Sequence, residues 1–189
     1  MTRLINSSTT VRQFIELSLF YDLASDAELL REAPRPNMVG GKMVPAQLDY
    51  ITLKQRFILS EIANDIDYLF VPCETLLELD RDTIATLPVL KVIGVSNHVV
   101  NELKRFSEAE TALASLNPPS DDERKAGVEG LPRDHFAIVD AIVRRCNGAY
   151  THDEVLNLTV ADIYAMQKVD TYNAIFAKRL NNIILNKRK

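Results

Sequence analysis

The sequence predicts a mainly α-helical protein, an irregular multi-helix bundle with a short arm or hairpin near residues 33–47. Apolar residues recur at spacings of three and four along most of the chain, as they do on one face of a helix. Residues that cap helices stand directly before several of these segments. The 189 residues are 47% hydrophobic and 25% charged, which is typical of a globular protein.

The first 50 residues contain one helical pattern and one segment of a different kind. Thr10 is placed to cap a helix whose apolar residues run from Val11 to Leu23. Residues 33–47 are rich in Pro and Gly, and two Met-Val pairs flank Gly40-Gly41-Lys42. A small hairpin fits this segment because Gly accepts the positive φ of a tight turn, and a flexible linker fits it equally well.

The middle of the chain continues with helical patterns. Thr52 and Gln55 have the spacing of a capping box. Pro72 interrupts the pattern over 68–79 and is tolerated there if it lies in a first helical turn. Leu87-Pro88 opens the next element, whose residues 89–95 are compatible with a strand or a helix. We expect a helix, because no second strong strand exists to pair with this segment.

The clearest boundary is the Pro-, Gly- and charge-rich segment 117–132, which we interpret as a loop or linker. The sequence therefore predicts an N-terminal helical region with the arm over 1–116 and a C-terminal helical unit, packed on the first, over 133–189. Asp134 caps the first helix of that unit. Thr159 and Asp162 begin a long amphipathic helix, with apolar residues at Ile163, Met166, Val169, Tyr172, Phe176, Leu180 and Ile183.

The apolar positions of this last helix cover more than one core-facing stripe. Such a helix is either deeply buried in a core or shared with a partner chain. Under the second interpretation we expect Tyr164, Tyr172, Ile175 and Ile184 to contact a partner, which also predicts a homo-oligomer.

A DNA-binding helix-turn-helix at about 134–169 is the alternative function. The chain carries 22 basic and 26 acidic residues, so its net charge of −4 creates no general attraction for nucleic acid. The last helix would have to enter the groove, yet Asp162 stands at its start and no Arg lies in its first two turns. We therefore consider nucleic acid an improbable partner.

Residues that could carry chemistry are isolated in the sequence. His98, His135 and His152 lack metal-ligand spacing, although they could form an enzyme site with nearby acids in three dimensions. Cys73 and Cys146 are far apart and are expected to be free thiols. We expect no catalytic residues, no cofactor and no metal. No stretch approaches 18 uncharged apolar residues, so we expect no membrane span.

Two stretches resemble a known family. The first runs from Thr52 to Leu59 and from Leu76 to Pro88, and has a "helix, helix, acidic turn, Leu-Pro, helix" order. The second, Tyr150 to Asp162, has the form "Tyr-x-x-x-Glu-Val/Ile-Leu-x-Leu-Thr/Pro" before a closing helix. Both resemble tail assembly chaperones and related small helical proteins of phage and prophage tail modules. The resemblance implies a non-enzymatic, all-helical protein of the bacterial cytoplasm that binds tail proteins, such as a tape measure, and self-associates.

Overall fold

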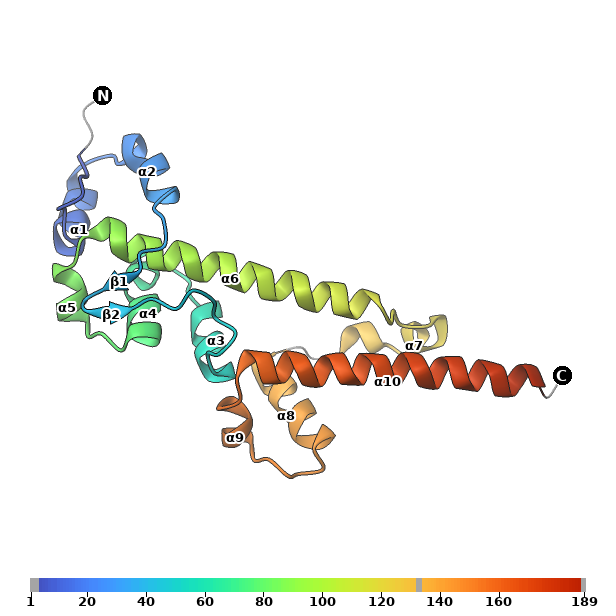
Figure 1. Cartoon of the computed structure of the whole chain (residues 1–189). Helices are drawn as coiled ribbons and strands as arrows, with labels where there is room; N and C mark the ends of the chain where they lie inside the picture. Colours follow the sequence, from blue (N-terminus) through green and yellow to red (C-terminus); the bar gives the residue numbers. More distant parts are fainter. Residues whose placement is uncertain (1–3, 132–133, 188–189) are drawn as a thin grey trace. The chain divides into compact units, whose positions relative to one another are not determined.

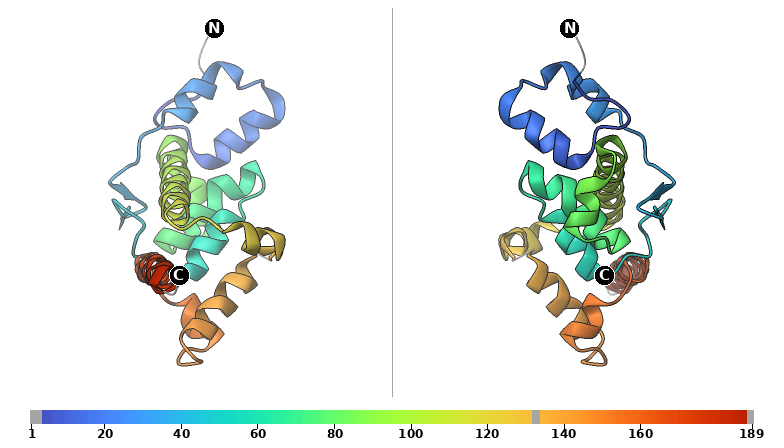
Figure 2. Two further views of the ribbon diagram at one scale, coloured as in Figure 1. Left: turned by 90° about the vertical axis from the view of Figure 1, so that its right-hand side faces the viewer. Right: turned by 90° about the vertical axis from the view of Figure 1, so that its left-hand side faces the viewer.

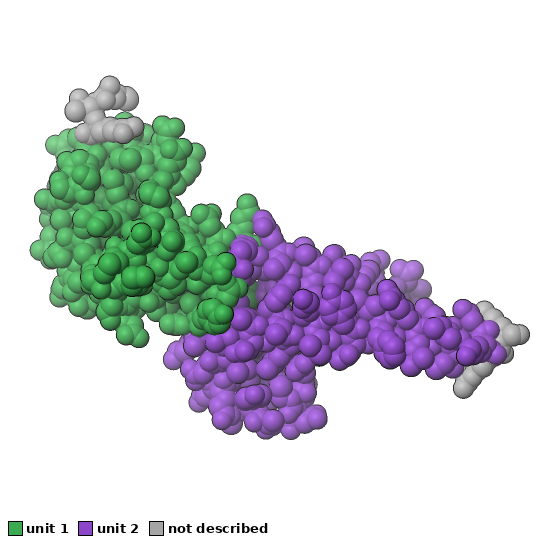
Figure 3. All heavy atoms as spheres, in the orientation of Figure 1, with its two compact units in different colours: residues 1–51, 55–104 green, residues 52–54, 105–189 purple. Residues whose placement is uncertain are grey.

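The computed structural model describes residues 4–131 and 134–187, which are mostly helical. The chain divides into two compact units (Figure 3). The first comprises residues 1–51 and 55–104, and the second comprises residues 52–54 and 105–189. This division falls inside a helix, whereas the sequence analysis placed it at 117–132.

The first unit contains short helices, a hairpin and the beginning of one long helix (Figure 1). In chain order its elements are α1 (Val11–Phe20), a 3₁₀ turn (Ala24–Asp26), α2 (Ala27–Arg31), β1 (Met38–Val39), β2 (Lys42–Met43), α3 (Leu53–Ser60) except its first two residues, α4 (Asp65–Leu77), α5 (Arg81–Thr86) and the part of α6 (Val89–Ser115) that ends at Lys104. Figure 2 views α6 end-on, with the hairpin to one side of it.

The predicted arm is a two-stranded antiparallel hairpin. Met38 pairs with Met43 and Val39 with Lys42. The turn between them uses Gly40 and Gly41, whose φ angles are 54° and 77°. Positive φ at both central residues is what a two-residue hairpin turn requires, so the Gly pair explains why a hairpin forms here. The mainly helical fold class with this hairpin is confirmed.

Pro72 lies in the interior of α4 and not in a first turn. A proline there has no N–H to donate to the carbonyl four residues earlier, which belongs to Tyr68. The hydroxyl of Ser96 on α6 donates to that carbonyl instead. The helix tolerates the proline because a neighbouring helix satisfies the oxygen that the proline leaves without a donor.

Residues 89–95, which were compatible with a strand or a helix, form the first turns of α6. The side-chain amide of Asn97 on this helix lies 3.0–3.1 Å from the carbonyl oxygens of Leu30, Arg31 and Ala33. Those carbonyls belong to the end of α2 and the residues after it, where a helix leaves acceptors without intrahelical donors. Asn97 thus fastens α2 to α6.

The core of the first unit is formed by apolar side chains from α1, the hairpin and α4 to α6. Fully or nearly fully buried members include Val11, Val39, Cys73, Leu77, Ile84, Val89, Val92 and Val95.

The second unit contains the rest of α6, α7 (Asp121–Lys125), a 3₁₀ turn (Val128–Gly130), α8 (His135–Arg145), α9 (His152–Leu156) and α10 (Val160–Lys187). The predicted loop over 117–132 therefore contains a helical turn, which begins at the capping box formed by Ser120 and Glu123. Its charged residues favour helix ends as well as loops, which is why composition alone suggested a linker. The buried apolar residues of this unit include Leu53, Phe106, Leu113, Val139, Ile142, Val155, Val160 and Ile163.

Candidate functional site

The long helix α10 begins at a reciprocal cap. The backbone N–H of Asp162 donates to the hydroxyl of Thr159, at 3.1 Å, and the Asp162 carboxylate accepts from the Thr159 N–H at 3.2 Å. This is the arrangement that the sequence predicted at these residues. It fixes the residue at which the helix starts.

One side of α10, here called the inner face, packs on the second unit. Its buried residues, Val160 and Ile163, lie in the first turn. About one to three turns beyond Ile163, the same side carries Gln167, Thr171 and Ala174, which are half-buried. Lys178 continues this side and contacts the segment before α8, with its Nζ 3.5 Å from the Pro118 carbonyl oxygen and 3.7 Å from the Glu123 carboxylate.

The opposite side of α10 is apolar and exposed. Five residues at spacings of three and four form a straight row, here called the outer stripe: Val169, Tyr172, Phe176, Leu180 and Ile183. Their exposed fractions are 53%, 53%, 66%, 43% and 54%. At 1.5 Å per residue the row extends for about 21 Å. A surface helix ordinarily turns its apolar side inward, and α10 does the reverse over this length.

The four residues expected to contact a partner do not lie together. Tyr172 belongs to the outer stripe, and Ile184 beside it is 41% exposed. Tyr164 and Ile175 are half-buried and lie nearer the inner face. Sequence reasoning left out the other stripe residues, Val169, Phe176, Leu180 and Ile183. The sequence does contain a signal for the outer stripe, because Gln167, Thr171 and Lys178 make the inner face the more polar side of the helix. Polarity alone, however, does not tell which side packs against the rest of the protein.

The charges around α10 differ between its two sides. On the inner side Lys178 faces Glu123, whose pKa is lowered first by the hydrogen bond from the Ser120 N–H and further by Lys178. Asp170 accepts a hydrogen bond from Arg145 on α8, and this contact raises the pKa of the guanidinium. The acids near the helix are therefore engaged within the second unit.

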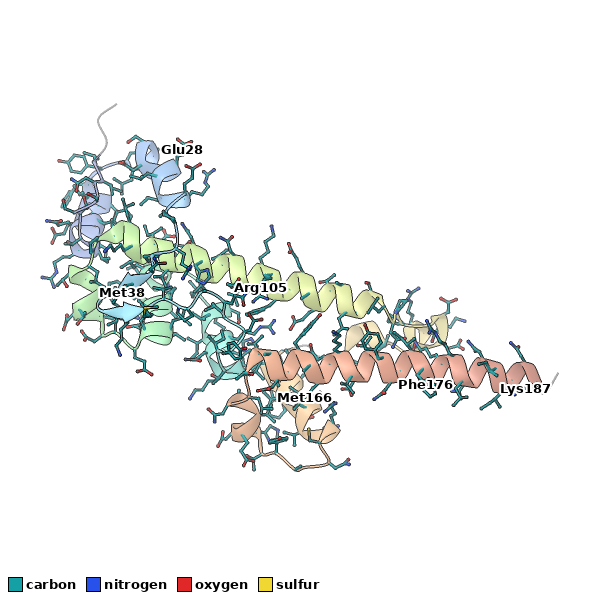
Figure 4. The ribbon with its side chains drawn as sticks, in the orientation of Figure 1. Glu28, Met38, Arg105, Met166, Phe176 and Lys187 are labelled. Carbon is teal, nitrogen blue, oxygen red and sulfur yellow. The ribbon has the colours of Figure 1, made fainter. Side chains whose placement is uncertain are left out.

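Three cations border the outer stripe and are here called the basic rim: Lys168, Arg179 and Lys187. Lys168 and Arg179 are about three helical turns apart and so share the flank beside Tyr172. Lys187 continues the row beyond Ile183. Within the part of the chain that the structure describes, none of the three forms an ion pair. Figure 4 draws the side chains along α10 and labels Phe176 in the stripe and Lys187 at its end.

The three histidines have separate surroundings. His98 Nε2 lies 2.9 Å from the Pro45 carbonyl oxygen in the first unit. In the second unit the His152 ring stacks on Phe136, with centroids 5.6 Å apart, and its Nε2 is 3.8 Å from Asp140. His135 is the first residue of α8. Over residues 4–131 and 134–187, no three His, Cys, Asp or Glu side chains are grouped so that they could hold a metal ion.

The segment considered for a helix-turn-helix forms α8, α9 and the first part of α10. The Asp162 carboxylate stands at the start of α10, where a recognition helix would meet phosphates, and Lys168 is its first cation. No observation on these helices favours contact with DNA over contact with protein.

No helix of the described residues combines the length and the apolar character needed to cross a bilayer. Comparison of the chain with protein-family models, with curated proteins and with solved structures found no match. The residues of the chain itself, and above all the outer stripe, therefore indicate the function.

Proposed function

We propose that this chain is a non-enzymatic assembly protein of a phage or prophage tail, and that it acts in the bacterial cytoplasm through contacts with other proteins. The observation that carries the proposal is the outer stripe. Five large apolar side chains in one straight row on a long helix are a surface that favours burial against a second protein.

The mechanism is masking. An assembly chaperone holds an apolar helix of a tail protein, such as a tape measure, until that helix is incorporated into the growing tail. The outer stripe covers apolar surface along about four helical turns, which matches the length of an ordinary partner helix. The basic rim adds a charge pattern that orients the bound helix.

The resemblance to tail assembly chaperones supports the tail as the setting. The segment Tyr150 to Asp162, which carries part of that resemblance, contains the caps of α9 and α10. This segment therefore determines where α10, the helix that bears the outer stripe, begins. The other part, Thr52 to Pro88, contributes α3 to α5.

The test is complementation in the source bacterium. The gene is deleted, the phage or prophage is induced, and electron microscopy counts tailed and tailless particles. We expect the deletion to lower the tailed fraction at least ten-fold and the wild-type chain to restore it. Phe176→Asp fails to restore tails, whereas Leu185→Asp, on the other side of the same helix, restores them. A normal tailed fraction in the deletion strain contradicts the proposal.

A DNA-binding function has a separate readout. Retention of the purified chain on duplex DNA, measured against salt concentration, falls steeply with salt for a protein that binds phosphates. We expect no retention at 150 mM salt. Light scattering over a range of concentrations measures self-association, the further property that the resemblance implies.

A further inference from the structure

We propose that the outer stripe takes one kind of occupant: an amphipathic helix of another protein, with acidic residues along the flank that meets the basic rim. This inference rests on the proposed function only in taking the stripe as a protein-binding surface. It adds the chemistry of the partner, which the stripe and its border define.

The shape of the site selects a helix. The stripe residues project from one side of a regular helix, in a row that keeps the 3.6-residue period from Val169 to Ile183. Apolar side chains at i, i+3, i+4 and i+7 of a partner helix interdigitate with such a row. The row runs for about 21 Å, so it accommodates about 14 residues of a partner helix.

The charges select an acidic partner. Lys168 and Arg179 border the stripe on the same flank, and neither has an ion-pair partner in the described chain. The nearest acid on the other flank, Asp170, is bound by Arg145. An acidic flank on the incoming helix would complement these cations, and a basic one would be repelled.

The same charges disfavour a second copy of the chain as the occupant. In a two-fold antiparallel pair of outer stripes, each flank faces its own equivalent, so Lys168 and Arg179 of both copies would meet. In a two-fold parallel pair, the basic flank would face the flank with Asn173 and Ala177, whose nearest acid, Asp170, is already bound by Arg145. Pairing of two outer stripes therefore leaves the cations of the basic rim either facing one another or without a complementary charge.

Site-specific crosslinking identifies the occupant in the cell. A photoreactive benzoylphenylalanine replaces Phe176 in the full chain, the source cells are irradiated, and mass spectrometry locates the crosslinked peptide. The same residue at Leu185 is the matched control. We expect position 176 to crosslink to an amphipathic segment of another protein with net negative charge, and position 185 to give no such product. A crosslink to the same chain, to a basic segment, or to nothing overturns the inference.

Binding of the crosslinked segment then tests the rim. A fluorescent synthetic peptide of that segment is titrated with the full chain at 50 mM salt, with anisotropy as the readout. We expect the double variant Lys168→Glu, Arg179→Glu to weaken binding at least ten-fold and added salt to narrow this difference. Phe176→Asp abolishes binding, and Leu185→Asp leaves it unchanged. Equal affinity of the wild type and the double variant contradicts the acidic-partner assignment.

The two proposals fail separately. An acidic amphipathic segment from a protein outside the tail supports the partner chemistry and contradicts the tail function. A tail protein that crosslinks through a basic or non-helical segment supports the function and contradicts the partner chemistry.

Discussion

Ser96 on α6 supplies the hydrogen bond that Pro72 removes from α4. The Ser96 side chain is fully buried, and its hydroxyl donates to the Tyr68 carbonyl, the acceptor that a residue with an N–H at position 72 would satisfy. The hydroxyl also lies 3.2 Å from the Val92 carbonyl of its own helix. The proline inside α4 thus requires a side chain with a hydrogen-bond donor at position 96 of α6.

Replacing Ser96 by Ala therefore leaves a buried carbonyl without a donor. We expect a loss of about 1–3 kcal/mol in the free energy of unfolding, measured by urea denaturation. In a Pro72→Ala background the backbone N–H at position 72 returns and can donate to the Tyr68 carbonyl. Ser96→Ala then lowers the free energy of unfolding by less than it does in the wild type. Ser115→Ala, also on α6 but exposed, is the control and changes stability little. Equal costs of Ser96→Ala in both backgrounds would contradict this account.

Gly94 is required by the close approach of α6 to the segment after α2. A Cβ at position 94 would lie 2.2 Å from the Pro34 carbonyl oxygen, a backbone atom that cannot move aside alone. We expect Gly94→Ala to lower the free energy of unfolding by about 1–3 kcal/mol, because the clash outweighs the higher helix propensity of Ala. Gly130→Ala meets no atom within 4 Å and serves as the control. Thermal unfolding of both variants measures the difference, and equal midpoints would contradict the close approach.

The buried thiol of Cys73 makes the protein less stable in alkali. Burial, with Glu74 nearby, raises its pKa to about 12. In the unfolded chain a thiol ionises at pH ~8.5. The stabilisation of the folded state by the neutral, buried Cys73 thiol is fully present below that pH. It is lost as the pH rises toward 12, at up to ~1.4 kcal/mol per pH unit. We expect the unfolding free energy of Cys73→Ala to fall less between pH 9 and 11 than that of the wild type.

Reagents for thiols provide a second measurement on the same group. Cys73 is buried, whereas Cys146 is half-buried at the end of α8. At pH 8 we expect one thiol to react before unfolding and mass spectrometry to place the label on Cys146. Equal labelling of Cys73 in the native protein would contradict its burial.

Phe176 and Ile163 test which side of α10 faces the protein. Phe176 is 66% exposed and Ile163 is 2% exposed, although the sequence assigns both to one amphipathic pattern. We expect Phe176→Ala to change the unfolding free energy by less than about 0.5 kcal/mol and Ile163→Ala to lower it by about 2–5 kcal/mol. A large loss in Phe176→Ala would show that the stripe belongs to a core.

Local signals in the sequence were sufficient for much of the secondary structure. Thr10, Asp134 and Thr151 cap the helices that follow them, and the Gly40-Gly41 pair forms the hairpin turn. These predictions succeeded because a cap or a tight turn depends on a few neighbouring residues.

Features that depend on distant residues were not predictable in this way. The interior position of Pro72 depends on Ser96, and the role of Asn97 depends on the end of α2. The division between the two units falls inside α6, where no change of composition marks it. For α10, periodicity identified apolar positions but not which of them face solvent, because that depends on how the helix packs.

The central claim is that the outer stripe of α10 is the surface through which this protein works. Its most direct test is quantitative affinity capture from the source cell with tagged full-length wild type, Phe176→Asp and Leu185→Asp. The account predicts that Phe176→Asp loses the proteins captured by the wild type at least ten-fold, and that Leu185→Asp retains them. Equal capture by the wild type and Phe176→Asp would contradict it.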